Sequence, residues 1–197
     1  MFIMLNHLNK YHIILASHSP RRKELLQGLG LNFTVRSLPD VDESYPNNLV
    51  GGEIAQYIAC KKAESYKPLL LENDLLITAD TLVYLNDQVL GKPKDSKEAE
   101  GMLRQLSGNT HEVFTGVCIL TKDYDTSFVA RTKVTFASLT EDEISYYINE
   151  YKPFDKAGSY GVQEWIGYIG VECISGSFYN VMGLPVQKLY AELKKIK

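Results

Sequence analysis

Two long strand-like segments separated by a short polar turn set the strongest limit on how this chain can fold. Residues 111–120 (HEVFTGVCIL) and 127–139 (SFVARTKVTFASL) are rich in β-branched and aromatic residues, and the polar stretch TKDYDT separates them. Two such segments joined by so short a turn form an antiparallel hairpin. A sheet that contains this hairpin cannot be wholly parallel.

Further strands and helices are predicted to interleave with this hairpin. The predicted strands lie at 13–16, 32–38, 74–91 (two strands joined by a turn at Asn86-Asp87) and near 168–174. The predicted helices lie near 20–29, 51–66, 95–107 and 140–150, with a last helix from Pro185, and 39–48 is a predicted acidic loop. Such interleaving around an antiparallel hairpin indicates an α/β fold with a mixed sheet.

The size and charge of the chain limit the class of protein to which it can belong. Its 197 residues suit one core, in one domain or in one domain with two lobes. We see no repeat, long linker or firm internal boundary, so 1–197 is treated as a single domain. A formal net charge of −3 argues against broad nucleic-acid binding, so any anion site must be local.

Several other classes find no support in the sequence. Cys60, Cys118 and Cys173 are widely spaced and odd in number, which favours reduced thiols over a disulfide framework or a metal cluster. The histidines lack metal-ligand spacing, and we find no nucleophile elbow or dinucleotide-binding glycine pattern. No apolar run is long enough to span a membrane and no signal-peptide pattern is present, so we expect a cytoplasmic protein without a membrane partner.

The first candidate site extends from Ser17 to Arg22. Pro20 follows a helix-capping serine, yet Arg21 and Arg22 occupy the helix end that normally disfavours cations. Two guanidiniums beside the unpaired N–H groups of a helix start suit the oxygens of a polyphosphate. Solvated surface arginines explain the same residues equally well, because this loop lacks the glycines and the lysine of a P-loop.

Carboxylates form the second candidate site. Asp80 follows an apolar run and is expected at or near a strand end, where a buried carboxylate needs a partner or a metal ion. There it suits the binding of Mg²⁺ or the activation of a water molecule. A structural pair with a nearby lysine is an equally good explanation. Glu43, in the acidic stretch DVDE, is more typical of a solvated loop.

Two lysines and a glutamine lie in stretches rich in glycine or proline. Lys92 occurs in LGKP, Lys156 occurs in FDKAGSYG, and Gln163 follows Gly161 by two residues. A single lysine is most often a solvated surface charge. Several cations in rigid loops, however, favour a shared phosphate ligand.

Four long stretches together resemble the Maf family of nucleotide pyrophosphatases, also called septum-formation inhibitors. They are LASHSPRRKELL, the segment from ADTLVYL to VFTGV, PFDKAGSYGVQ and GSFYNVMGLPVQKL, in the family's order and spacing. The resemblance implies an elongated mixed β-sheet flanked by helices, with two lobes and a cleft between them, similar to the inosine triphosphate pyrophosphatases. It also implies a homodimer. This sequence departs from the family where Glu164 and Trp165, rather than glycine, follow Gln163.

The resemblance also implies a role for eight residues. Asp80 falls on the principal catalytic acid and Lys92 on the catalytic lysine. The implied substrate-binding residues are Ser17, Arg21, Arg22, Glu43, Lys62 and Gln163. Asp80 and Glu43 are also the expected ligands of a divalent metal cation, Mg²⁺ or Mn²⁺.

The implied reaction is hydrolysis of a nucleoside triphosphate to the monophosphate and pyrophosphate. ADT with DKAGSYGVQ resembles the branch of the family that acts on dTTP and UTP. We therefore expect an enzyme that clears dTTP and UTP, and modified pyrimidine nucleotides, from the nucleotide pool. The alternatives are the same reaction on 7-methyl-GTP or another non-standard purine nucleotide, and a nucleotide-binding regulator of septum formation.

Overall fold

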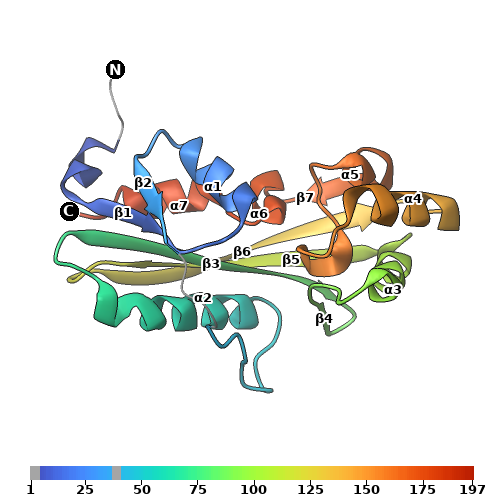
Figure 1. Cartoon of the computed structure of the whole chain (residues 1–197), viewed down its shortest axis with the longest axis horizontal. Coiled ribbons are helices and arrows are strands. Elements are labelled where there is room, and N and C mark those ends of the chain that lie inside the picture. Colours follow the sequence, from blue (N-terminus) through green and yellow to red (C-terminus); the bar gives the residue numbers. More distant parts are fainter. Residues whose placement is uncertain (1–4, 37–40) are drawn as a thin grey trace. The chain divides into compact units, whose positions relative to one another are not determined.

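The computed structural model describes residues 5–36 and 41–197 and contains one mixed sheet (Figure 1). The strands are β1 (His12–Leu15), β2 (Phe33–Val35), β3 (Asp74–Leu85), β4 (Gln88–Leu90), β5 (Thr110–Leu120), β6 (Asp125–Phe136) and β7 (Val171–Ser175). They follow the order β2-β1-β3-β5-β6-β7, and β4 pairs with β3. The pairs of β1 with β2 and β3 are parallel, whereas β3–β4 and β6–β7 are antiparallel, so the predicted mixed sheet is confirmed.

The helices begin and end close to most of the predicted positions. They are α1 (Pro20–Gln27), α2 (Gly52–Tyr66), α3 (Ser96–Leu106), α4 (Glu141–Tyr151), α5 (Trp165–Gly170), α6 (Phe178–Met182) and α7 (Val186–Leu193). Short 3₁₀ helices are η1 (Asn6–Lys10), η2 (Lys67–Leu69) and η3 (Ala157–Ser159). Of the helices in the described ranges, none combines the length and the apolar character that a membrane span requires.

The strand predicted near 168–174 is wrong over its first residues. Residues 168–170 complete α5, and β7 begins at Val171. The turn into α5 depends on Gly167, because a Cβ atom there would lie 1.9 Å from the carbonyl oxygen of Val162. Helix α6 was not predicted. The last two residues of the predicted strand 32–38 and the first two of the predicted loop 39–48 lie outside the described residues.

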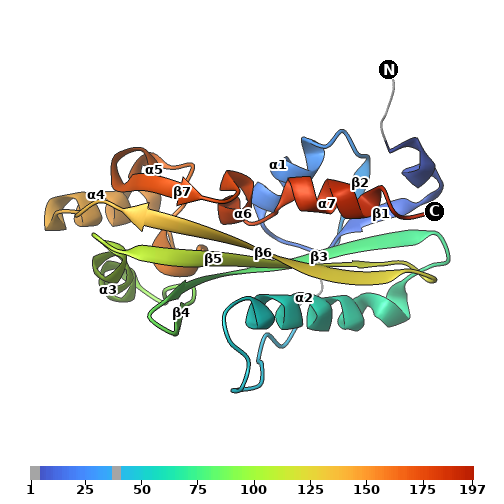
Figure 2. The same ribbon diagram turned by 180° about the vertical axis from the view of Figure 1, so that it is seen from behind.

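The chain divides into two compact units, and the first contains the two termini. It comprises Met1–Asp80, Thr115–Ala130 and Gly183–Lys197. Within this unit α2 lies on one side of the strands, and α1 and α7 lie on the other (Figures 1 and 2). The contact between α2 and β5 is very close, because a Cβ atom at Gly116 would lie 2.3 Å from the carbonyl oxygen of Ala55.

The second unit comprises Thr81–Phe114 and Arg131–Met182. Its core holds a cluster of aromatic rings in which His111, Phe136 and Tyr160 make mutual edge-to-face contacts. The His111 Nε2 atom lies 2.7 Å from the Tyr160 hydroxyl. These rings pack β5 and β6 against the segment that follows η3.

Candidate functional site

Arg22 is anchored where β1 leads into α1. Its Nε donates to the carbonyl oxygen of Gly183 at 2.9 Å, and its Nη1 donates to Ser17 Oγ at 3.4 Å. Ser17 is buried, and its Oγ also accepts from the backbone N–H of Ser19 at 3.2 Å. These contacts fix the plane of the guanidinium. Arg22 is therefore not the freely solvated surface arginine that the sequence left open.

Charges of both signs surround Arg22. Burial lowers the pKa of the Arg22 guanidinium, and the positive charge of Arg21 lowers this pKa further. The negative charges of Asp80 and Glu43 raise the pKa and so oppose the shift. Arg21 is half-buried, whereas Lys23 is exposed. The first turn of α1 therefore brings two arginines, but not the neighbouring lysine, into the electrostatic environment of two carboxylates.

Lys62 joins the two predicted carboxylates. Its Nζ lies 2.7 Å from Asp80 Oδ1 and 2.8 Å from Glu43 Oε1. Lys62 lies on α2 and Asp80 on β3, and their side chains are only 15% and 14% exposed. The expectation that Asp80 lies at or near a strand end is wrong, because β3 continues from Asp80 to Leu85. Asp80 thus has the lysine partner that the structural explanation required. That partner is also one of the residues that the family resemblance assigns to the substrate site.

A neighbouring ion pair fixes the loop before α2. The Lys61 Nζ lies 2.7 Å from Asp42 Oδ2 and donates to the backbone oxygen of Ser44 at 2.9 Å. The hydrogen bonds from Lys61 and Ser44 hold the pKa of Asp42 well below its usual value. Lys61 and Lys62 are consecutive, as are Asp42 and Glu43. The first pair therefore positions the loop so that Glu43 meets Lys62.

The carboxylates of Asp80 and Glu43 suit a divalent cation bound together with a ligand. Both contact the same ammonium group, so a positive charge already lies between them. Mg²⁺ commonly takes one or two carboxylates and completes its coordination with water and phosphate oxygens. Over residues 5–36 and 41–197, no group of three or more His, Cys, Asp or Glu could hold a metal ion by itself. The donor set fits an ion that is shared with a phosphorylated ligand.

Lys92 and Gln163 belong to the second unit. Lys92 is exposed in the segment that follows β4, and the adjacent Pro93 is buried. Gln163 lies between η3 and α5, and its Oε1 atom is buried without a hydrogen-bond partner in the described part of the chain. A buried amide oxygen is costly without a donor. This oxygen could therefore accept a hydrogen bond from a ligand.

A hydrogen-bonded network fixes the loop between η3 and α5. Tyr147 on α4 donates its hydroxyl to Glu164 Oε2 and accepts from the backbone N–H of Gly161 at 3.0 Å. Glu164 Oε1 lies 3.1 Å from the Nζ of Lys156, which also lies 2.8 Å from Asp155 Oδ1. The Lys156 side chain is only 9% exposed. The two carboxylates neutralise Lys156 within the unit, which gives it a structural role.

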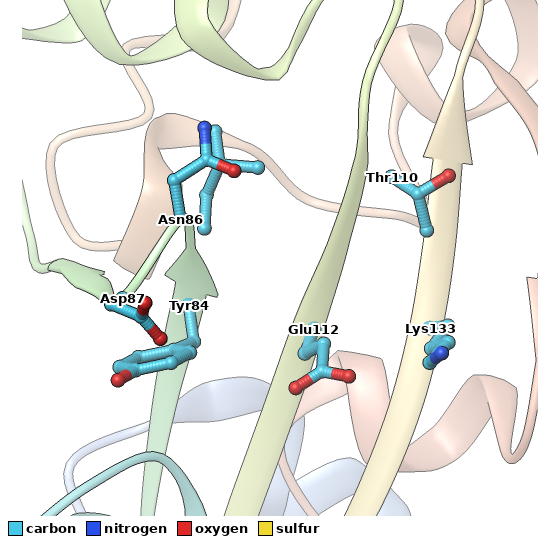
Figure 3. Close-up of a pocket in the computed structure, with 7 residues that line it drawn as sticks. Tyr84, Asn86, Asp87, Thr110, Glu112 and Lys133 are labelled. Carbon is cyan, nitrogen blue, oxygen red and sulfur yellow. The ribbon is translucent and has the colours of Figure 1, made fainter.

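A hollow of about 340 Å³ on the second unit is lined by none of the predicted residues (Figure 3). It is lined by Tyr84, Leu85, Asn86, Asp87, Thr110, Glu112 and Lys133. The charged residues of this lining are one cation, Lys133, and two carboxylates, Asp87 and Glu112. A triphosphate requires an excess of positive charge, so this hollow is not the predicted nucleotide site.

Two of the contacts described above carry no clear signal in the sequence. Gly183 holds Arg22 through a backbone carbonyl, which any residue possesses. Tyr147 has the pattern of an apolar residue on a helix face, and its hydroxyl meets Glu164 only in the folded chain. Glu164 did leave a signal, because it stands where the family usually has glycine.

Comparison with known proteins identifies the family of the chain. The model of the Maf-like protein family matches residues 12–196. A dTTP/UTP pyrophosphatase of Bacteroides thetaiotaomicron is 61% identical over 98% of this chain and 100% of that protein. A dTTP/UTP pyrophosphatase of Parabacteroides distasonis is 59% identical over 97% of this chain and 99% of that protein.

The fold is also found in a solved structure of low sequence identity. The Ham1 protein of Staphylococcus aureus superimposes with a TM-score of 0.54 at 17% identity, covering 94% of this chain and 100% of that chain. This similarity confirms the mixed-sheet fold class. The family model matches nearly the whole chain, and the two dTTP/UTP pyrophosphatases are 61% and 59% identical to it. The chain therefore belongs to the Maf family.

Proposed function

We propose that this protein is a nucleoside triphosphate pyrophosphatase that hydrolyses dTTP and UTP to the nucleoside monophosphate and pyrophosphate. The observation that carries the proposal is the Lys62 ammonium held between Asp80 and Glu43, with the fixed guanidinium of Arg22 close to both carboxylates. Such a cluster combines cations for phosphate with a carboxylate for water activation. The names of the relatives support dTTP and UTP as substrates.

The phosphates are bound by the first turn of α1. Arg21, Arg22 and the backbone N–H groups of this turn supply positive charge and hydrogen-bond donors for the triphosphate. Ser17 and Gly183 hold Arg22 before the substrate arrives, so little ordering is needed on binding. Lys92 supplies a further cation for the phosphates and Gln163 is a further residue of the substrate pocket, both by family resemblance.

The chemical step uses Asp80. Its carboxylate orients a water molecule and takes a proton from it as the water oxygen attacks the α-phosphorus. The bond between this phosphorus and the bridging oxygen breaks, and pyrophosphate leaves. Lys62 fixes the orientation of Asp80 through the contact of 2.7 Å. Asp80 and Glu43 would also hold Mg²⁺ or Mn²⁺, which neutralises phosphate charge when it is bound.

Three further features belong to the proposal as expectations from the sequence or from the family resemblance. They are a homodimer, a cytoplasmic location, and two lobes with the substrate cleft between them. Size-exclusion chromatography with light scattering would test the first. A monomer at all concentrations would remove the dimer from the proposal without affecting the proposed reaction.

The experiment that tests the activity compares four nucleotides on the purified protein. Release of pyrophosphate from dTTP, UTP, 7-methyl-GTP and ITP would be measured with Mg²⁺ and with Mn²⁺. We expect turnover of dTTP and UTP well above that of the two purine nucleotides. Preference for 7-methyl-GTP or ITP would replace the substrate class. Tight binding of dTTP without turnover would favour a nucleotide-binding regulator.

A further inference from the structure

Two cysteines of the first unit lie on facing elements. Cys60 is half-buried on α2, and Cys118 is buried on β5. Cys60 packs against a buried apolar cluster that contains Cys118, and each thiol perturbs the ionisation of the other. The third cysteine, Cys173, is exposed on β7 in the second unit. The chain therefore holds a pair of neighbouring thiols and a separate exposed one.

The close approach of α2 to β5 explains this pairing. No side chain separates the two elements at Gly116, where a Cβ atom would lie 2.3 Å from the carbonyl oxygen of Ala55. Cys118 follows Gly116 by two residues, so both face the same side of the strand. Helix α2 therefore lies close enough to β5 for a thiol on its near side to reach Cys118.

A second contact shows which side of α2 faces the hairpin. Gln56 donates from Nε2 to Ser127 Oγ on β6 at 2.9 Å. Cys60 lies one helical turn further along, on the same side of α2 as Gln56. Ser127, the partner of Gln56, also interacts with the Cys60 thiol. Two neighbouring residues of α2 thus meet the β5–β6 hairpin, and one of them is Cys60.

The two thiols differ in their readiness to ionise. The hydrogen bond from Cys118, and then the one from Ser127, lowers the pKa of Cys60 to about 6. The contact with Cys60, together with burial, raises the pKa of Cys118. The carboxylate of Asp125, 4.0 Å from Cys118 Sγ, also keeps Cys118 protonated. A half-buried thiol that ionises readily therefore lies beside a buried thiol that resists ionisation.

We propose that Cys60 and Cys118 form an oxidative modification site, at which a small peroxide produces an intramolecular disulfide. The Cys60 thiolate attacks one oxygen of hydrogen peroxide, the O–O bond breaks, and hydroxide leaves. Cys60 is then a sulfenic acid. The Cys118 sulfur attacks the Cys60 sulfur, the S–O bond breaks, and the hydroxyl group leaves as water with the Cys118 proton. Two thiols are oxidised and one peroxide is reduced to two waters.

The proposed oxidation is reversible. A dithiol such as dithiothreitol attacks the disulfide and restores both thiols through a mixed disulfide. Cys173 has no thiol neighbour among the contacts of the described residues, so an oxidised Cys173 would need a partner from another molecule. This difference separates the proposed site from general thiol oxidation.

The test treats the reduced full-length protein with one equivalent of hydrogen peroxide. We expect the intact mass to fall by two hydrogen atoms and the number of free thiols to fall from three to one. Peptide mapping should give a cross-link between Cys60 and Cys118, which dithiothreitol removes. Cys60 should react about tenfold faster than Cys173, because its lowered pKa favours the reactive thiolate and Cys118 lies beside it.

Two variants control the assignment. Cys173→Ala changes an exposed residue and should still form the cross-link. Cys118→Ala should halt the reaction at the Cys60 sulfenic acid, which dimedone traps. Oxidation of Cys173 ahead of Cys60, a link between molecules, or an unchanged mass in the wild-type protein would each overturn the proposal. The wild-type measurement stands even where Cys118→Ala does not fold.

Discussion

The Nζ atom of Lys62 lies 2.7 Å from Oδ1 of Asp80, so α2 and β3 of the first unit meet through a mostly buried ion pair. A buried pair of this kind gives little net stability, because desolvation offsets most of the attraction. Loss of one partner, however, leaves the other charge poorly compensated. In the proposed enzyme this pair holds the catalytic carboxylate in one orientation.

Asp80→Asn is expected to lower pyrophosphate release from dTTP by at least about a hundredfold, because the amide cannot take a proton from water. The isosteric change should leave the circular dichroism spectrum unaltered. Asp87→Asn is the matched control: Asp87 is an exposed turn residue with φ 61°, which asparagine tolerates. Its activity should equal that of the wild type. Similar losses in both variants would contradict the role of Asp80.

The adjacent lysines of α2 offer a second comparison. Lys62→Met should reduce kcat/KM for dTTP about tenfold or more, because Asp80 and Glu43 lose their shared ammonium. Lys61→Met removes the neighbouring pair with Asp42, which holds the loop of Glu43 but does not contact Asp80, so kcat/KM should fall by no more than about threefold. Steady-state kinetics on both variants checks this. Equal losses of kcat/KM in the two variants would show that activity depends on the net charge of α2 and not on the contact of Lys62 with Asp80.

Local signals in the sequence predicted much of the fold. Ser19 accepts from the backbone N–H of Arg22 at the start of α1, and Thr140 with Glu143 forms a capping box at the start of the predicted helix α4. Caps depend on residues within one helical turn, so spacing alone identifies them. Residues 168–170 were mistaken for strand because their apolar run is equally suited to either structure, and the turn at Gly167 is set by contact with Val162.

The contacts of the candidate site depended on more distant residues. No local pattern pairs Lys62 with Asp80, which lies 18 residues further along, or places Gly183 at Arg22. The sequence therefore indicated which types of residue form the candidate site, and the family resemblance indicated their positions in the chain. It left open whether Asp80 had a lysine partner and whether Arg22 was a surface charge. Tertiary packing of α2, β3 and α1 decides both.

Arg22 and Lys23 differ in position far more than in charge. Arg22→Lys should raise KM for dTTP about tenfold, because one ammonium cannot reproduce the separate contacts of Nε and Nη1 with Gly183 and Ser17. Lys23→Ala should leave KM unchanged, since Lys23 is exposed. Initial rates over a range of dTTP concentrations test both. An effect of Lys23→Ala as large as that of Arg22→Lys would indicate attraction by net charge alone.

The buried imidazole of His111 predicts a loss of stability in acid. Burial lowers its pKa to about 4 in the folded protein, against about 6.5 in an unfolded chain. Between these values the unfolded chain binds a proton that the folded protein does not. The stabilisation is therefore complete above about pH 6.5 and declines by up to about 3 kcal/mol as the pH falls to about 4.

Urea unfolding at several pH values would measure this decline. His111→Gln should be less stable than the wild type at neutral pH, because the contact with Tyr160 changes, yet its stability should fall less steeply between about pH 6.5 and 4. Carboxylates titrate in both proteins, so the difference between the two curves isolates His111. Parallel curves would assign the acid sensitivity to other groups.

The proposed disulfide should also slow catalysis, an expectation that rests on the proposed activity. A disulfide brings its sulfur atoms to about 2 Å. Helix α2 already touches β5 at Ala55 and Gly116, so the movement falls on the later part of α2, which carries Lys62 two residues after Cys60. We expect turnover of dTTP to fall severalfold on cross-linking and to recover with dithiothreitol. Cys118→Ala cannot form the cross-link. After treatment with the same peroxide, it should therefore not show the loss of turnover that accompanies cross-linking. Complete cross-linking with unchanged turnover would separate the modification from catalysis, whereas absent turnover in the reduced protein would instead contradict the proposed function.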